Sequence, residues 1–186
     1  AMRYIPHKRG NVSRWVREAA GNDDVEGIDA ALDAASNKDE ALNKGDIMGR
    51  TALHWAAGRG RVDAVRHLLA LGVRVKISGM HHTPLHDLAE SGAAAAPTLV
   101  QELVEAAPWQ LTYKDNTGAM PVDRAKSAGQ RQMVRALESA AMMVTGAERA
   151  MISRHTHSFL PSCLSVATIS LDSPGSSVTT PLLEGA

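Results

Sequence analysis

Four histidines are the first candidates for chemistry in this sequence: His54, and the closely spaced His81, His82 and His86. His82 and His86 are four residues apart, which is one helical turn and a suitable spacing for two ligands of a metal ion. A zinc site would also need a cysteine or a carboxylate at matched spacing. A metal-dependent hydrolase built on His81, His82 and His86 is therefore a distant third hypothesis, behind the two binding functions given below. We predict no metal site.

Other catalytic patterns are missing from the sequence. It contains no Gly-x-Ser-x-Gly elbow, no Walker loop and no Gly-x-Gly-x-x-Gly fingerprint. The single cysteine, Cys163, lies in a stretch rich in serine and threonine, where a nucleophile would be poorly positioned. We predict no catalytic residue, no cofactor and no enzymatic activity.

The composition of the chain limits which kinds of partner, core and location it can have. The chain has 186 residues, with 20 lysines and arginines against 20 aspartates and glutamates, so no overall field attracts nucleic acid. Aromatic residues make up only 3%, which favours a slim core of alanine, leucine and valine. One cysteine cannot form an internal disulfide, so we expect an intracellular location, in the cytoplasm or the nucleus, with an organelle as the alternative. No apolar run has the length of a transmembrane segment.

The histidines belong to a helical pattern that is clearest between Gly49 and Gly72. Thr51 is a suitable N-cap residue, and the apolar residues after it recur at one-turn spacing. Gly60 ends this first helix, and a second amphipathic helix runs from Val62 to Gly72. Neither helix can bury its apolar side alone, so the unit requires copies of itself.

The copies are present. His82-Thr83-Pro84-Leu85-His86 repeats Arg50-Thr51-Ala52-Leu53-His54 at an offset of 83 − 51 = 32 residues, and the stretch 115–125 repeats it more loosely. These strings resemble the ankyrin repeat, which has a period of about 33 residues and the signature Thr-Pro-Leu-His-x-Ala. The resemblance implies an all-α solenoid with hairpin-like turns, in about four repeats.

We divide the chain on this pattern. A basic arm (1–12) precedes a repeat domain (13–141), with repeats at about 13–45, 46–78, 79–114 and 115–141. A helical extension (142–152) and a flexible tail rich in Ser, Thr and Pro (153–186) follow; the tail has one apolar run, 164–171. Ser13 is expected to cap the first helix, and 37–45 to be an exposed loop. The alanines at 93–96 are expected to lengthen a helix, with Pro97 at N1 of the next, and His81 to distort its turn.

The resemblance also implies a function. Ankyrin repeats bind other proteins along a concave surface, while Thr51, His54, Thr83 and His86 stabilise the turns. Carried over, the partner-binding positions are Ile47, Met48, Arg50, Trp55, Arg59, Met80, His82, Asp87, Glu90, Asn116 and Thr117. A basic cluster, formed by Arg59, Arg61, Arg66, Arg74 and Lys76, suggests an acidic partner segment near Arg59, Arg61 and Arg74, although a solvated face explains it as well. We predict an adaptor or scaffold; the alternative is a regulatory or targeting part of a larger enzyme or membrane complex.

Overall fold

The computed structural model describes residues 11–93 and 96–156, and within them it contains helices and no strands. The first repeat pattern forms α1 (Val12–Gly21), α2 (Val25–Asp33) and the short α3 (Lys38–Asn43). The remaining elements are α4 (Ala52–Gly58), α5 (Val62–Ala70), α6 (Pro84–Ser91), α7 (Ala96–Ala106), the 3-10 helix η1 (Pro108–Leu111), α8 (Pro121–Ser127) and α9 (Arg131–Thr156).

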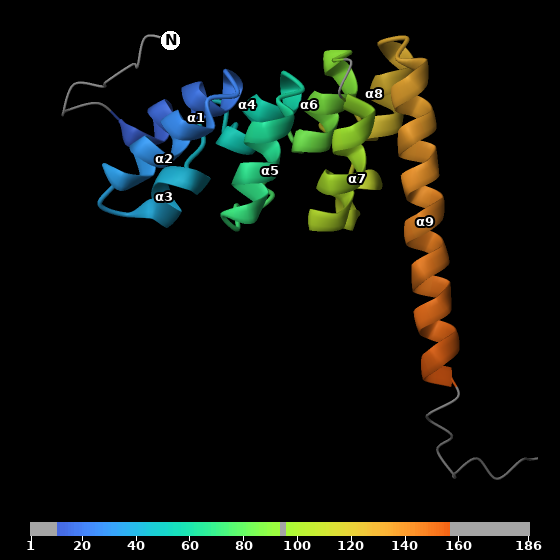
Figure 1. Ribbon diagram of the computed structural model, residues 1–186. Coiled ribbons are helices and arrows are strands. Elements are labelled where there is room, and N and C mark those ends of the chain that lie inside the picture. The colour runs from blue at the N-terminus through green and yellow to red at the C-terminus, as the bar shows by residue number, and fades with distance from the viewer. Residues whose placement is uncertain (1–10, 94–95, 157–186) are drawn as a thin grey trace, which may run out of the picture.

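The described helices form pairs that follow one another along a solenoid (Figure 1). The first helices α1, α4, α6 and α8 form one row, and the second helices α2, α5, α7 and α9 form the other. The first helices approach closely because small side chains face their neighbours: Ala52, Ala56 and Ala57 of α4 are fully buried. Larger side chains, such as Ile28, Leu68 and Leu103, fill the space under the second helices. The core is therefore continuous from pair to pair.

Two expectations in the N-terminal part are wrong. The segment 37–45 is not an exposed loop, because Lys38–Asn43 form α3 and bury Ala41 and Leu42. The Asn37 side chain caps this helix by accepting a hydrogen bond from the Glu40 N–H at 3.1 Å. Ser13 is not the cap of α1, because the helix starts at Val12, after Asn11, and buries Ser13.

The alanine-rich connection also differs from expectation. Helix α6 ends at Ser91, and Gly92 takes a left-handed conformation with φ of 62°. That conformation directs the chain out of the helix, so the alanines do not lengthen α6. Helix α7 starts at Ala96, so Pro97 is its second residue and not the first.

The C-terminal part contains one long helix. Helix α9 runs without interruption from Arg131 to Thr156, through the predicted extension and into the first residues of the predicted tail. It projects beyond the other helices (Figure 1). The rest of the predicted tail and almost all of the N-terminal arm lie outside the described residues. Among the described helices, none combines the length and the hydropathy needed to cross a membrane.

Candidate functional site

The signature histidines connect successive repeats. At the start of α4, His54 Nδ1 accepts a hydrogen bond from the Thr51 N–H at 3.2 Å. His54 Nε2 lies 3.2 Å from the carbonyl oxygen of His82, in the next turn, so Nε2 carries the proton and donates it. Burial lowers the pKa of His54 to about 4. The ring is therefore neutral, and it bridges two turns.

The same contacts recur one repeat later. His86 Nδ1 accepts from the Thr83 N–H at 3.3 Å, and Nε2 lies 3.2 Å from the Ala119 carbonyl oxygen. Burial again lowers the pKa of this histidine. In the fourth repeat Asp123 replaces the histidine, and its Oδ2 accepts from the Met120 N–H at 3.1 Å. A carboxylate has no N–H to donate onward, so Asp123 caps its own helix but cannot bridge to a further turn.

His81 does not distort its turn, contrary to our expectation. Its φ is 59°, close to the 75° of Gly49 and the 81° of Gly118 at the equivalent positions. The hydrogen bond from its N–H to the Ser78 carbonyl is 2.9 Å long, as is the bond from Gly49 to Asp46 in the preceding turn. Histidine is among the residues that enter the left-handed region most readily. The turn therefore keeps its shape at some cost in backbone strain.

The three neighbouring histidines do not converge. His81 Nδ1 lies 3.4 Å from the Tyr113 hydroxyl, His82 Nδ1 lies 3.2 Å from Asp87, and His86 makes the turn contacts above. His82 and His86 stack, with ring centroids 5.7 Å apart. Among the side chains that the structure describes, no three from His, Cys, Asp or Glu are arranged to hold a metal ion.

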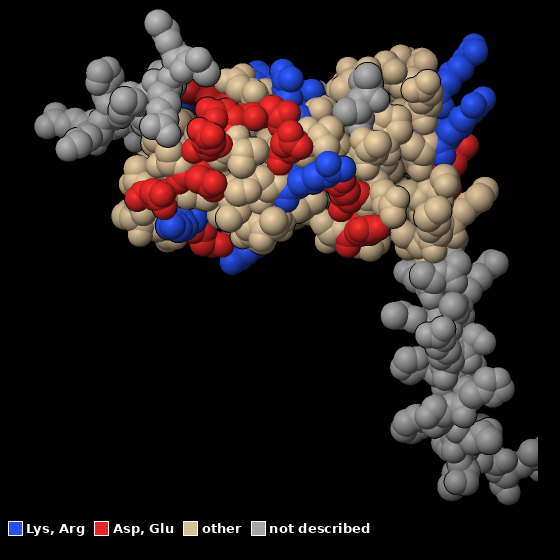
Figure 2. Space-filling model, viewed as in Figure 1, with Lys and Arg blue, Asp and Glu red and all other residues tan. Residues whose placement is uncertain are grey.

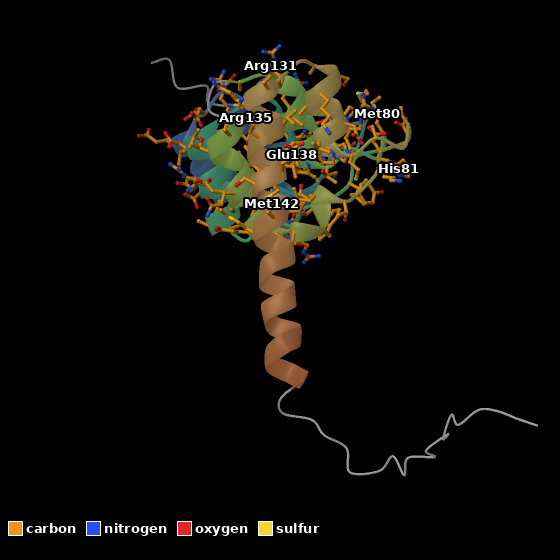
Figure 3. All side chains as sticks on the ribbon, turned by 90° about the vertical axis from the view of Figure 1, so that its right-hand side faces the viewer. Met80, His81, Arg131, Arg135, Glu138 and Met142 are labelled. Carbon is orange, nitrogen blue, oxygen red and sulfur yellow. The ribbon has the colours of Figure 1, made fainter. Side chains whose placement is uncertain are left out.

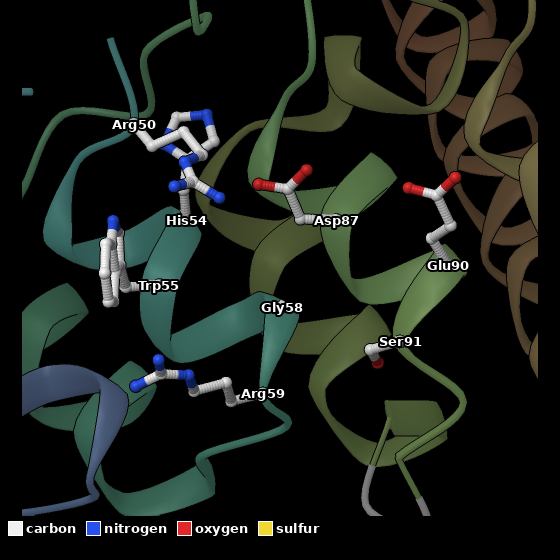
Figure 4. A pocket seen from close by; sticks show the side chains of 8 residues that line it. All are labelled: Arg50, His54, Trp55, Gly58, Arg59, Asp87, Glu90 and Ser91. Atoms are coloured by element: carbon white, nitrogen blue, oxygen red, sulfur yellow. The ribbon is translucent and has the colours of Figure 1, made fainter. Parts of the chain in front are cut away.

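A groove of about 450 Å³ lies between α4 and α6, on the row of first helices (Figure 4). One wall is formed by α4 and the turn before it, with Arg50, His54, Trp55, Gly58 and Arg59. The other wall is α6, with Asp87, Glu90 and Ser91. Five of the eleven positions carried over from the ankyrin pattern therefore line a single groove: Arg50, Trp55, Arg59, Asp87 and Glu90.

Trp55 is the aromatic side chain of the α4 wall. Its Nε1 donates to Asp46 Oδ2 at 3.2 Å, which fixes the ring. The guanidinium groups of Arg50 and Arg59 lie 5.3 Å and 4.8 Å from the centre of the ring. Arg50 also pairs with Asp46 at 3.2 Å. The result is a fixed, half-buried aromatic side chain with two cationic neighbours.

The α6 wall is acidic. Desolvation raises the pKa of the Asp87 carboxyl, and the hydrogen bond from His82 opposes this effect. Glu90 is half exposed and lies 3.3 Å from Arg124. Arg124 in turn contacts Asp115 at 2.6 Å. Asp115 accepts hydrogen bonds from Thr117 and Arg124 that hold its pKa far below the ordinary value, against the desolvation that would raise it.

The other predicted binding residues lie outside this groove. Ile47, Met48 and Met80 stand on two successive turns and are exposed by 105%, 40% and 44%. Asn116 and Thr117 are exposed on the turn of the fourth repeat. His82, by contrast, is buried, and its ring contacts Asp87 of the groove and Arg124, the partner of Glu90.

The arginines of the basic cluster contact different neighbours. Arg61 Nε donates to the Gly21 carbonyl at 3.2 Å, and Arg74 lies 3.4 Å from Asp39. Arg66 pairs with Glu102 at 2.8 Å. Of the cluster, only Arg59 lines the groove.

Two residues with structural roles, Gln110 and Asp46, are not predicted by the sequence patterns above. Gln110 is fully buried and accepts from the Leu85 N–H at 3.3 Å while donating to the Leu103 carbonyl at 2.9 Å. Its position outside the repeat signature gave no signal. Asp46 was detectable, because Ser78 and Asp115 open the equivalent turns, at offsets of 78 − 46 = 32 and 115 − 78 = 37 residues, the third repeat being the longer one.

Stacked helix pairs with bridging turns define the class: this is an all-α solenoid of helical repeats. Residues 17–108 match the family model of ankyrin repeats in three copies. The chain is thus an ankyrin-repeat protein. Ankyrin repeats are generally protein–protein interaction modules and are typically non-catalytic.

Proposed function

We propose that the protein acts as a non-catalytic adaptor or scaffold that binds a segment of another protein in the groove between α4 and α6. The observation that carries this proposal is Trp55, held by Asp46 and flanked by Arg50 and Arg59 on the groove wall. Tryptophan and arginine are the residue types most enriched at the energetic centres of protein interfaces. Because the Trp55 ring is already fixed, binding costs little side-chain entropy.

The charges of the walls suggest the chemistry of the partner. Arg50 and Arg59 lie on the α4 side, whereas Asp87 and Glu90 lie on the α6 side (Figure 4). A segment that directs an acidic side chain towards Arg59 and a basic side chain towards Glu90 would complement both walls. Arginine suits a carboxylate because its planar fork can donate two parallel hydrogen bonds. We therefore propose that the acidic partner segment binds in the groove beside Arg59, and not at Arg61 or Arg74.

Peptide display against the purified chain tests this proposal. Selected peptides should share an acidic residue, and Arg59→Glu should weaken their binding by at least tenfold. Arg135→Glu is the matched control, because Arg135 is an exposed arginine on the outward side of α9 (Figure 3). Replacing the acidic residue of the peptide by lysine should restore binding to the Arg59→Glu variant. Equal effects of the two arginine substitutions would refute the groove as the binding site.

A further inference from the structure

A second groove lies at the far end of the solenoid, between the second helices α7 and α9. Its volume is about 490 Å³. Its lining is mostly apolar, with Val100 and Val104 from α7, Pro108 from η1, and Ala136, Ala140 and Met143 from α9. Two polar residues on the α7 side satisfy each other, since Gln101 Nε2 donates to Glu105 Oε1 at 2.9 Å. The groove is therefore suited to apolar side chains and offers few polar groups to a ligand.

Met143 shows that this groove is left open. Its side chain lines the groove and yet is exposed by 65%. The surface where α7 meets α9 carries few charged side chains, whereas acidic groups gather over the N-terminal helices (Figure 2). An exposed apolar groove of this kind marks an interaction site.

The opposite side of α9 has a different character. Arg131, Arg135, Glu138 and Met142 lie along the side that points away from the repeats (Figure 3). Three of these four residues are charged, so this side does not extend the apolar surface. A second copy of the chain would therefore meet a narrow apolar strip next to a charged one. This arrangement favours a single extended segment in the groove over a second folded copy.

The sequence supplies such a segment close by. Residues 164–171, Leu-Ser-Val-Ala-Thr-Ile-Ser-Leu, contain five apolar residues and no charged one. They follow the end of α9 at Thr156 after only seven residues, 157–163. The distance from Val144 to Thr156 along α9 is about 18 Å at 1.5 Å per residue. Seven residues span up to about 23 Å, so the chain can return to the groove.

We propose that residues 164–171 of the same chain occupy the groove between α7 and α9, with Val166, Ile169 and Leu171 against Val104, Ala140 and Met143. Because the segment is tethered within reach, its effective concentration at the groove is high, and weak apolar contacts suffice. The interaction covers the open apolar lining of this groove. It is independent of the groove between α4 and α6.

The single cysteine and the eight methionines of the sequence provide a direct test. A nitroxide attached to Cys163, next to the segment, should broaden the methyl NMR signal of Met143 in the full chain. The signal of Met48, on a turn near the other end of the solenoid, should stay sharp. Ile169→Asp should restore the Met143 signal, whereas Thr179→Asp, in the same tail but outside the segment, should leave it broadened. A sharp Met143 signal in the parent, or one that Ile169→Asp does not change, would overturn the proposal.

Two further measurements separate this occupant from others. With a fluorescent dye on Cys163, Met143→Glu should lower the anisotropy, whereas Met142→Glu, which changes an adjacent residue exposed by 74% on the outward side, should not. Equal effects of the two substitutions would contradict the proposal. In a mixture, a nitroxide-labelled chain without isotopes should not broaden Met143 of an isotope-labelled Cys163→Ser chain. Broadening there would show that a second copy fills the groove.

Discussion

The carboxylate of Asp23, in the turn between α1 and α2, accepts a hydrogen bond from the Ala64 N–H at 2.8 Å. Ala64 is in the first turn of α5, whose own N-cap residue, Arg61, makes no side-chain cap. Asp23 therefore caps a helix of the next repeat. It also has a φ of 61°, a conformation that aspartate and asparagine enter more readily than alanine.

Substitutions at Asp23 should consequently follow a fixed order of stability. Asp23→Asn keeps both the acceptor and the tolerance of positive φ, so we expect little change. Asp23→Gly loses the cap alone, at about 1 kcal/mol. Asp23→Ala loses the cap and strains the backbone, at about 2–3 kcal/mol in total. Urea unfolding measures these values, and an alanine variant as stable as the glycine variant would exclude a strained conformation at this position.

The stability of the protein should depend on pH through His54. Its folded-state pKa is about 4 against an ordinary value of 6.5, because burial disfavours the charged ring. Between these two values the unfolded state binds the proton and the folded state does not, so stability decreases as the pH falls. The full loss is about 3 kcal/mol. It is complete below pH 4, and above pH 6.5 His54 makes no contribution to the pH dependence.

A variant isolates this effect from opposing ones. The raised pKa of Asp87 acts in the other direction, because its folded state takes up a proton first as the pH falls. The parent curve therefore contains both contributions. His54→Gln keeps a side chain able to accept from the Thr51 N–H but cannot titrate. Urea unfolding at pH 7 and pH 4.5 should show a smaller decrease for His54→Gln than for the parent, and identical decreases would rule out His54 as the cause.

Much of the repeat region follows from local chemistry in the sequence. The strings around His54 and His86 predict a turn, a capped helix and a partner repeat, because each residue acts on neighbours within one turn. Gly60 predicts the end of its helix, and it does adopt the left-handed conformation, with φ of 62°. Gly92 has the same φ and ends α6, although the alanines after it suggested a longer helix. The fold class could therefore be predicted from two short motifs.

The groove between α4 and α6 could not be predicted from the sequence. Trp55 and Asp46 are nine residues apart, and neither fits a pattern that would predict their contact. The sign of the charge on each wall depends on which side chains α4 and α6 direct into the groove, which the repeat signature leaves variable. The basic residues looked like one cluster in the sequence, yet Arg61 and Arg74 are engaged with different neighbours. The helix α3 was missed because its six residues are too few to show a helical period.

Replacing His81 by glycine should stabilise the domain. The residue holds a φ of 59°, and a left-handed conformation costs a residue with a Cβ about 1–2 kcal/mol. Part of this gain is offset by the greater entropy of glycine in the unfolded chain, so we expect a net increase of about 1 kcal/mol. Thermal unfolding measures it. A lower melting temperature would mean that the contact with Tyr113 outweighs the strain.

The equivalent glycines provide the comparison. A Cβ at Gly49 would come within 2.8 Å of the backbone nitrogen of Gly79, whereas a Cβ at Gly118 would meet nothing within 4 Å. Their φ values are similar, at 75° and 81°. Gly49→Ala should therefore be clearly more destabilising than Gly118→Ala. The two changes would cost the same if conformation alone mattered at these turns.

The turns beside the groove between α4 and α6 offer a further test of the proposed binding site. Met48 and Met80 are exposed on successive turns, which the Gly79 N–H joins by donating to the Met48 carbonyl at 2.7 Å. A partner segment that continues out of the groove along these turns would cover both methionines. Met48→Glu with Met80→Glu should therefore abolish binding of a peptide selected against the parent, because two charges would lose their hydration in the complex. Unfolding should change by only about 0.5 kcal/mol for each substitution.

Helix α5 provides a matched control for the double methionine variant. Asp63 and Arg66 are exposed on α5, in the other row of helices. Reversing both charges should leave affinity within about twofold of the parent, although Arg66 loses its ion pair with Glu102. Isothermal titration with one selected peptide compares the two double variants directly. If the α5 pair abolished binding while the methionine pair retained it, the partner would lie along the row of second helices, and the groove beside Trp55 would not be the binding site.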